Sequence, residues 1–251
     1  MPDLFGRILH RSGIVTYAAG EDSSTRVLPR FEHALHLAGP LRGLAVADVG
    51  CWTGDFLHLC QGVGATSLVG FDIGGPWLVD ARRRLPNATL VEVADLSELQ
   101  AANISQVDVV FVLETLEHIP RGREFEAMRA LSRILKPGGC LILSTPAAGI
   151  AACADPAWVL AGHRHYRART IRRLAQSGGF ESTTFRYSGD LRESLDVALL
   201  YLYKHVLRQP YRSPHLLAGA GHRLTMQRRF DSTTIWVRAT KQRNPSGFPP
   251  P

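Results

Sequence analysis

The sequence predicts an α/β protein built on a doubly wound, mainly parallel β-sheet. Between residues 44 and 144, short apolar runs alternate with segments of helical periodicity, which is typical of strand–helix–strand units. Helices cover both faces of such a sheet, and its strands are therefore apolar. With 251 residues and 45% apolar side chains, the chain is long enough to form one substantial hydrophobic core.

The predicted elements begin with an N-terminal helix. The segment "LPRFEHALHLAG" is amphipathic and ends at Gly39 and Pro40, so residues 1–40 are expected to form a helical lid or packing element. The main domain is expected at residues 41–241. Its first five strands are predicted at residues 44–49, 66–71, 89–93, 107–113 and 140–144, separated by helices that begin near Asp55, Pro76 and Arg123.

Residues 123–135 show the clearest helical pattern. Five apolar residues share one face at helical spacing, namely Phe125, Met128, Leu131, Ile134 and Leu135. The sequence "KPGG" follows, and its proline and two glycines are expected to stop the helix before the fifth strand.

Two further strands complete a predicted sheet of seven. A helix is expected at residues 170–176, followed by strands at residues 182–187 and 233–240. The long insertion between these strands is expected to form a cap at residues 190–230, because loops of this length are usually functional or disordered. The tail at residues 242–251 contains "NPSGFPPP" and is expected to be disordered.

The stretch "VADVGCWTGDFLHLC" contains the turn between the first strand and the first helix of the sheet. In a doubly wound sheet this turn lies at the carboxyl edge, where the backbone approaches a ligand closely. Gly50 and Gly54 flank the turn, but it matches neither the GxGxxG pattern of nicotinamide-binding loops nor the GxxxxGK pattern of phosphate-binding loops. Asp48 precedes the first glycine, and a carboxylate there would repel a pyrophosphate and attract an amine.

The residues "DVGCWTG" resemble the first motif, DxGxGxG, of class I S-adenosylmethionine-dependent methyltransferases. The later segments "LVGFDIGG", "VEVADLSEL", "VDVVFVLETLEHIP" and "LSRILKPGGCLILSTP" are also similar to that family, so the resemblance covers residues 41–146. It implies a Rossmann-like, doubly wound, seven-stranded mixed sheet with helical lid and cap elements. It also implies S-adenosyl-L-methionine as the cofactor and S-adenosyl-L-homocysteine as its product.

Trp52 departs from the family motif, because it stands where the middle glycine is usual. The turn stays intact only if its backbone torsions suit a residue with a Cβ atom. The indole ring is expected either to cover the methionine part of the cofactor or to pack on the lid.

The same resemblance implies cofactor contacts from the ends of several strands. Asp72 is expected to accept hydrogen bonds from the ribose hydroxyls, and Asp95 to take the adenine amino group beside Leu96. The complete predicted cofactor set is Asp48, Gly50, Cys51, Trp52, Thr53, Gly54, Asp72, Ile73, Asp95, Leu96 and Glu114.

Methyl transfer from a sulfonium ion is a direct displacement, so the protein mainly aligns the acceptor and, for a hydroxyl group, removes its proton. The candidate catalytic bases are Glu114, His118, His163 and His165. For His118, packing that holds the loop is an equally good interpretation. No metal is expected, because no carboxylate partners accompany the histidine pair nearby in the sequence.

The segment "GHRHYRARTIRRLAQSGGF" is similar to the one that precedes the sixth strand in small-molecule methyltransferases. The resemblance places the segment over the acceptor, with Arg164 and Tyr166 as candidate substrate contacts. A solvent-facing basic stretch is the alternative interpretation.

The net charge of +7 is unevenly distributed. Residues 156–180 and 197–230 contain many arginines but no aspartate or glutamate. This distribution favours a small-molecule acceptor that is anionic or carrier-bound, or peripheral contact with an acidic membrane surface.

The apolar "VALLYLYKHVL" is expected to be a cap helix or a homodimer contact. Nucleic acid is a disfavoured partner, because the sequence has no basic motif interleaved with aromatic residues.

The four cysteines show no CxxC spacing, so neither a zinc site nor a disulfide framework is indicated. No apolar run is long enough for a membrane span. The sequence therefore predicts a soluble, cytoplasmic protein.

These observations predict a transferase that O-methylates a hydroxylated small molecule, such as a sugar or a secondary metabolite. The preference for oxygen rests on the candidate histidine bases. N-methylation of a small molecule, methylation of RNA and a catalytically silent cofactor-binding module are the alternatives, and Trp52 is the residue that raises the last of them.

Overall fold

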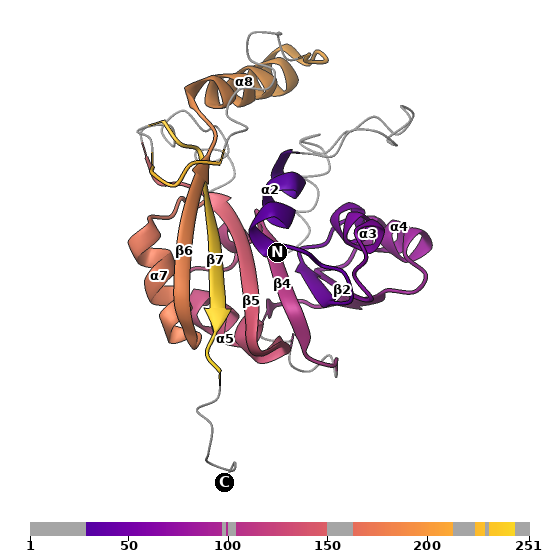
Figure 1. The fold of residues 1–251 in the computed structure, drawn as a ribbon. Helices are drawn as coiled ribbons and strands as arrows, with labels where there is room; N and C mark the ends of the chain where they lie inside the picture. Colours follow the sequence, from indigo (N-terminus) through magenta and orange to yellow (C-terminus); the bar gives the residue numbers. More distant parts are fainter. Residues whose placement is uncertain are drawn as a thin grey trace.

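The computed structural model describes residues 29–96, 99, 104–149, 163–212, 224–228 and 231–243. These residues form a seven-stranded mixed sheet with the strand order β3-β2-β1-β4-β5-β7-β6 (Figure 1). Paired strands from β1 to β5 run parallel, whereas β7 pairs antiparallel with both β5 and β6. The strand order reverses between β1 and β4, and ligands of such sheets bind at the carboxyl ends of the strands at this point.

The seven predicted strands are confirmed, with small differences at their ends. They are β1 (Ala45–Val49), β2 (Ser67–Asp72), β3 (Thr89–Glu92), β4 (Val107–Leu113), β5 (Leu135–Pro146), β6 (Phe180–Ser188) and β7 (Thr234–Lys241). The helices are α2 (Pro29–Ala38), α3 (Asp55–Gly62), α4 (Pro76–Arg84), α5 (Glu124–Ile134), α7 (Ala168–Ser177) and α8 (Leu191–Tyr201). Two short helical segments are η2 (Leu116–His118) and η4 (Leu202–Leu207).

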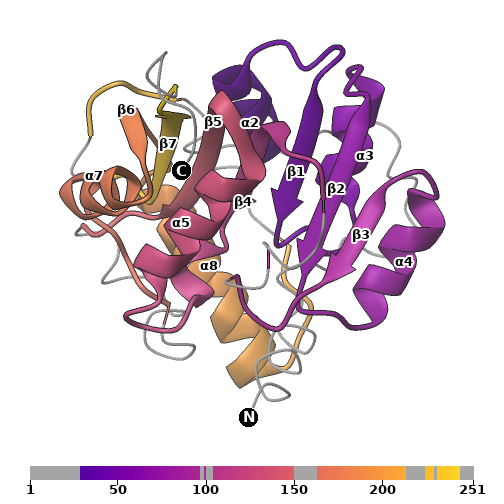
Figure 2. The same cartoon turned by 90° about the horizontal axis from the view of Figure 1, so that it is seen from below.

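Each face of the sheet carries its own hydrophobic core. Successive side chains of a strand point to opposite faces, so Val46 of β1 lies in one core while Ala47 and Val49 lie in the other. Helices α2, α3 and α4 contribute to the core of Val46. Helices α5 and α7 pack side by side over the opposite core (Figure 2). The sheet is therefore buried on both faces, and its carboxyl edge is left for the site.

Two details of the predicted fifth strand and its helix are wrong. The "KPGG" segment lies inside β5, where the pairing shifts from Val107↔Leu135 to Val109↔Cys140 and so accommodates extra residues as a bulge. Phe125 is 49% exposed, because α5 buries a face formed by Ala127, Met128, Ala130, Leu131 and Ile134.

Helix α2 packs directly on the sheet. Its Ala34 is fully buried, and the ring of Phe31 lies 5.0 Å from that of Phe56 in α3. Arg238 of β7 donates hydrogen bonds to the carbonyl groups of Leu37 and Ala38 at 2.7 and 3.0 Å. Residues 1–28 and 244–251, with most of the predicted lid and the predicted tail, lie outside the described residues.

The predicted cap is helical over α8 and η4. Asp190 caps α8 by accepting hydrogen bonds from the backbone N–H groups of Arg192 and Glu193 at 2.9 and 3.2 Å. Figure 1 shows α8 beyond the end of β6, separate from the helices that cover the sheet. The predicted cap also includes residues 213–223 and 229–230, which lie outside the described residues.

Candidate active site

The glycine loop lies at the carboxyl end of β1 and has a left-handed backbone at three positions. Gly50, Trp52 and Gly54 have φ angles of 84°, 49° and 75°. A Cβ atom at Gly50 would lie 2.3 Å from Oγ1 of Thr115, so only glycine fits there. Trp52 adopts a conformation that glycine adopts at lower cost, and the turn is intact despite this departure from the family motif.

The remaining loop residues tie the turn to its surroundings. The backbone N–H groups of Gly50 and Cys51 donate to the carbonyl oxygen of Phe71 in β2, at 2.8 and 3.1 Å. The Thr53 hydroxyl donates to Asp55 at the start of α3 at 2.6 Å. Burial raises the pKa of the Cys51 thiol, which is therefore protonated and acts as a small apolar residue.

Asp48 is a buried acid at the base of this loop. Its side chain and backbone together are only 4% exposed. Burial, followed by the charge of Asp72, raises the pKa of Asp48 to about 7, and Arg30 opposes the shift. A cation beside Asp48 would favour its ionised form, so this position fits the ammonium group of the cofactor's methionine part.

Asp72 at the end of β2 already accepts hydrogen bonds from three protein donors. Its Oδ2 atom accepts from the Trp52 N–H at 2.8 Å, and Oδ1 accepts from the Ile73 N–H and from Trp77 Nε1, both at 2.9 Å. Burial raises the pKa of Asp72, against the opposing effect of these hydrogen bonds. The two indole rings are stacked, with centroids 4.7 Å apart and an interplanar angle of 2°.

This arrangement partly fits the predicted ribose contact. A carboxylate offers about four acceptor positions, and three are in use. Two ribose hydroxyls would therefore need one donor to leave Asp72, and the indole of Trp77 is the side-chain donor among the three.

Three further predicted cofactor residues, among them the adenine contacts Asp95 and Leu96, lie at two neighbouring strand ends. Ile73 is 60% exposed directly after Asp72, and Leu96 is half-buried against the α5 side of the sheet. Asp95 forms an ion pair with Arg123 at 3.4 Å. The exposed Ile73 offers apolar surface for a planar base.

Glu114 and Glu117 form a pair of carboxyl groups at the carboxyl end of β4. Glu114 has a left-handed φ of 50°, and its N–H donates to the carbonyl oxygen of Ser144 at 3.1 Å. The two glutamate side chains hydrogen-bond to each other, and Glu117 also accepts from the Thr145 hydroxyl at 3.0 Å. Glu117 is 4% exposed, whereas Glu114 keeps part of its surface exposed.

The environment of this pair keeps one proton on it. Burial raises the pKa of both side chains, and the charge of Glu114 raises the pKa of Glu117 further. Two such carboxyl groups in contact cannot both ionise without strong repulsion. The pKa of Glu117 is raised well above its ordinary value, so the pair retains a proton more readily on Glu117 than on Glu114.

Two of the three candidate histidines meet at this edge. The rings of His118 in η2 and His163 are 4.6 Å apart and perpendicular, at 83°. Burial of the imidazole, followed by His163 and Arg164, lowers the pKa of His118 to about 4, although the residue as a whole is exposed to solvent. His118 is therefore neutral at pH 7. His165 is half-buried and adjoins Tyr166, whose N–H donates to the Pro146 carbonyl at the end of β5 at 2.9 Å.

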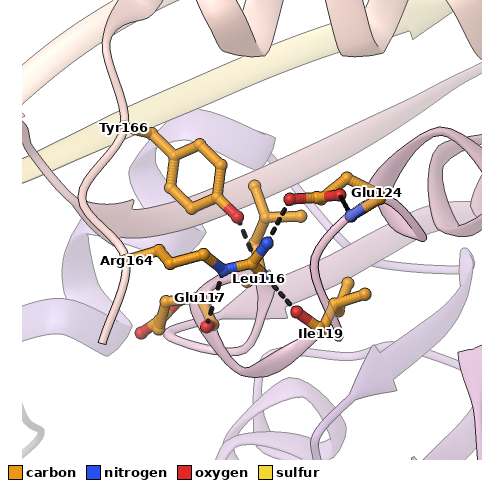
Figure 3. Close-up of polar contacts among 7 residues, drawn as sticks. Leu116, Glu117, Ile119, Glu124, Arg164 and Tyr166 are labelled. Atoms are coloured by element: carbon orange, nitrogen blue, oxygen red, sulfur yellow. Dashed lines mark hydrogen bonds and ion pairs between the residues drawn. The ribbon is translucent and has the colours of Figure 1, made fainter. Parts of the chain in front are cut away.

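Arg164 and Tyr166 face inward onto the η2 turn (Figure 3). Arg164 donates to the carbonyl oxygens of Glu117 at 3.3 Å, of Leu116 at 3.1 Å and of Ile119, and it forms an ion pair with Glu124. The Tyr166 hydroxyl donates to the same Leu116 carbonyl at 3.3 Å. With 13% of its side chain exposed, Arg164 supports the turn that carries Glu117 and His118.

The sequence prediction missed Glu117 and Trp77. The available signal for Glu117 was its place in the segment that follows the fourth strand, three residues after Glu114. The signal for Trp77 was the glycine pair before it, because a Cβ atom at Gly75 would lie 2.7 Å from the indole ring.

Three further observations concern other predicted features. Within the described part of the chain, no group of three or more His, Cys, Asp or Glu side chains is arranged to hold a metal ion. Among the same residues, no helix is long and apolar enough to cross a membrane. Cys51, Cys60 and Cys140 are buried free thiols.

The comparisons with known proteins agree with this architecture. Ubiquinone biosynthesis O-methyltransferase of Thiobacillus denitrificans is 37% identical over 109 residues, which cover 42% of this chain and 46% of that relative. The chain thus spans about half the length of the relatives it matches.

Two solved structures share the fold. An S-adenosylmethionine-dependent methyltransferase of Mesorhizobium loti has a TM-score of 0.59 and 16% identity, over 85% of this chain and 98% of that one. Phosphoethanolamine N-methyltransferase 2 of Haemonchus contortus, solved with S-adenosylhomocysteine, has a TM-score of 0.60 and 16% identity, over 85% of this chain and 52% of that one.

A family model described as a methyltransferase domain matches residues 25–184, which is more than half of the chain. This match includes the glycine loop, the acids at the ends of β1 and β2, and the Glu114–Glu117 turn. The chain therefore belongs to the class I S-adenosylmethionine-dependent methyltransferase family.

Proposed function

We propose that this protein transfers a methyl group from S-adenosylmethionine to a hydroxyl group of a small molecule. The observation that carries the proposal is the Glu114–Glu117 pair at the carboxyl end of β4, in which Glu117 is buried and Glu114 is half-buried. A carboxylate with a raised pKa is a stronger base than an ordinary one, and a hydroxyl acceptor needs such a base more than an amine does. The matched relatives named O-methyltransferases support the same choice.

In the proposed site, the cofactor lies over the glycine loop. It supplies an electrophilic methyl group on a sulfonium ion. Asp48 would bind its ammonium group, Asp72 its ribose hydroxyls, and Ile73 with Leu96 its adenine ring. Asp95 would take the adenine amino group in exchange for part of its ion pair with Arg123.

Glu114 is the proposed general base. It keeps some exposure to solvent, while the buried Glu117 holds the shared proton and donates a hydrogen bond to it. His118 is neutral and is the second candidate to accept the proton, with His163 against its ring. Arg164 and Tyr166 act through the turn that they hold, so we assign them a positioning role.

The proposal includes acceptors that carry an acidic group. Burial raises the pKa of both Asp48 and Glu114, and the positive charge of Arg30 in α2 opposes both shifts, so a cation acts on both acids of the site. The arginines at positions 169, 172 and 173, by contrast, are exposed on α7. A homodimer remains a prediction from the sequence.

The test is the release of S-adenosylhomocysteine with a panel of phenols, catechols, sugars and amines as acceptors. With an active hydroxyl acceptor, Glu114→Gln should lower kcat about 100-fold or more and remove the acidic limb of the pH–rate profile. Glu117→Gln keeps a hydrogen-bond donor beside Glu114 and should retain most activity. Glu117→Leu removes the donor and should lose most activity.

Glu126→Gln is the matched control, because Glu126 is exposed on α5 and forms an ion pair with Arg123 at 2.7 Å. Wild-type kcat in Glu114→Gln would remove Glu114 as the base. If His118→Asn then abolished the acidic limb, the histidine would take its place.

A catalytically silent cofactor-binding module is the second candidate. The contact between Trp77 and Asp72 favours it, since that indole occupies an acceptor position that the ribose needs. Binding of S-adenosylhomocysteine without turnover of any acceptor in the panel would support this candidate.

A further inference from the structure

Exposed apolar side chains gather on α8 and η4. Leu191, Leu195, Leu202, Val206 and Leu207 are 52%, 51%, 43%, 68% and 48% exposed. The first four are separated by four, seven and four residues, which places them in one stripe along a helix. Only Ser194 and Tyr201 of α8 are buried, so this helix presents an apolar face that the described residues leave uncovered.

The acids and the arginines of the same segment differ in exposure, although Arg192 lies 3.6 Å from Asp190. Each acid is engaged within the protein: Asp190 caps the helix, Glu193 accepts from the Thr233 hydroxyl at 2.6 Å, and Asp196 accepts from the Tyr211 hydroxyl at 2.6 Å. The arginines face solvent. Arg208 and Arg212 are exposed, and 66% of the Arg192 side chain is exposed.

We propose that α8 and η4 dock on an anionic lipid surface, with the apolar stripe in the bilayer interface and the arginines on the headgroups. A helix with an apolar face and flanking arginines binds such a surface through buried apolar area and electrostatic attraction. A second copy of the chain fits less well. In an antiparallel contact Arg192 would face the partner's Arg208, and in a parallel contact each arginine would face its own counterpart.

The position of the helix connects this surface to the candidate active site. α8 begins directly after β6, which runs parallel to β5 because both pair antiparallel with β7. It therefore leaves the sheet at the carboxyl edge, and Glu193 in its first turn is close enough to raise the pKa of Glu114. Docking would turn this edge toward the bilayer. If the proposed function also holds, an acceptor dissolved in the membrane would reach the site from there.

The experiment is co-sedimentation of the full chain with vesicles of phosphatidylcholine alone or mixed with phosphatidylglycerol. We expect binding to the mixed vesicles that weakens with added salt, and little binding to phosphatidylcholine alone. The double variant Leu195→Asp/Val206→Asp and the double variant Arg208→Glu/Arg212→Glu should each reduce the partition coefficient about tenfold or more. Because all four side chains are exposed, these variants should fold, and circular dichroism checks this.

The matched controls are Val79→Asp and Arg83→Glu on α4, where the valine is 44% exposed and 77% of the arginine side chain is exposed. They should bind the mixed vesicles as the wild type does.

Failure of the wild type to sediment with these vesicles would overturn the proposal, and so would unchanged binding of both double variants. A dimer in sedimentation velocity that Leu195→Asp/Val206→Asp dissociates, without vesicle binding, would assign the stripe to a second copy. Docking needs no methyl transfer, so failure of the proposed function would leave this result intact.

Discussion

Two residues, one in the glycine loop and one at the end of β4, hold backbone conformations that are unfavourable for side chains with a Cβ atom. Trp52 and Glu114 have φ angles of 49° and 50°. Each costs roughly 1–2 kcal/mol relative to an ordinary conformation. The hydrogen bonds from the Trp52 N–H to Asp72 and from the Glu114 N–H to Ser144 offset part of this cost. The strain thus lies where the loop meets the acids of the site.

Asp48→Asn tests the proposed ammonium contact. Because a salt-linked hydrogen bond is lost, affinity for S-adenosylhomocysteine should fall about 10–100-fold. Wild-type affinity should rise with pH up to about 7, where Asp48 becomes ionised, and the variant should lose this dependence. Calorimetric titration on both sides of this pH measures the effect.

The same substitution has an opposite effect on the stability of the protein without cofactor. The pKa of Asp48 is raised from 3.8 to about 7 on folding, so the stability that the neutral acid contributes is present below about pH 4 and lost as the pH rises to 7. Asp48→Asn should therefore gain stability relative to the wild type across this window in thermal unfolding. Parallel curves for the two proteins would contradict the buried, neutral state of Asp48.

Trp77→Phe tests whether the indole and the ribose compete for Asp72. The phenyl ring can still stack on Trp52 but cannot donate to Asp72, so affinity for S-adenosylhomocysteine should be unchanged or increased by up to about tenfold. Cofactor binding should also change the tryptophan fluorescence of the wild type more than that of the variant. A large loss of affinity in Trp77→Phe would mean that the indole itself binds the cofactor.

At the scale of elements, the η2 turn depends on a side chain from a distant segment. Arg164 links three carbonyl oxygens around this turn with Glu124 at the start of α5. Arg164→Met should lower the free energy of unfolding by about 3 kcal/mol, because Glu124 loses its partner in a largely buried ion pair. It should also lower kcat more than it raises the KM of the acceptor. A change confined to the KM would instead indicate direct contact with the acceptor.

The order of the elements was predictable because each depends on local signals. The glycines of the loop, the apolar runs of the strands and the proline at the start of α4 all act within a few residues of chain. The bulge at "KPGG" depends on the pairing of β5 with β4, and the burial of α5 depends on α7 and the sheet. Neither signal is local, so both details were missed.

The site residues were predictable from the sequence only where strand pairing alone brings them together. Asp48 and Asp72 end predicted strands, so their meeting at one edge follows from parallel pairing. The Glu114–Glu117 pair and the Arg164 contacts require a short helical turn and a segment 47 residues further along the chain. Contacts that join segments so far apart arise only from the folded sheet.

At the scale of the whole molecule, the residues that stabilise the fold and the residues of the proposed site occupy different parts of the sheet. The two hydrophobic cores occupy its faces, and the acids of the proposed site gather at its carboxyl edge between β2, β1 and β4. Helix α8 leaves from that same edge. One edge of the protein would thus hold the cofactor, the acceptor and the docking surface.

The most direct measurement is calorimetric titration of the full chain with S-adenosylmethionine, S-adenosylhomocysteine and NAD, beside the variant Asp72→Ala. We predict saturable binding of the first two ligands at one site, no binding of NAD, and loss of binding in the variant. Failure of S-adenosylhomocysteine to bind, or the same affinity in Asp72→Ala, would contradict the proposed cofactor site at the glycine loop.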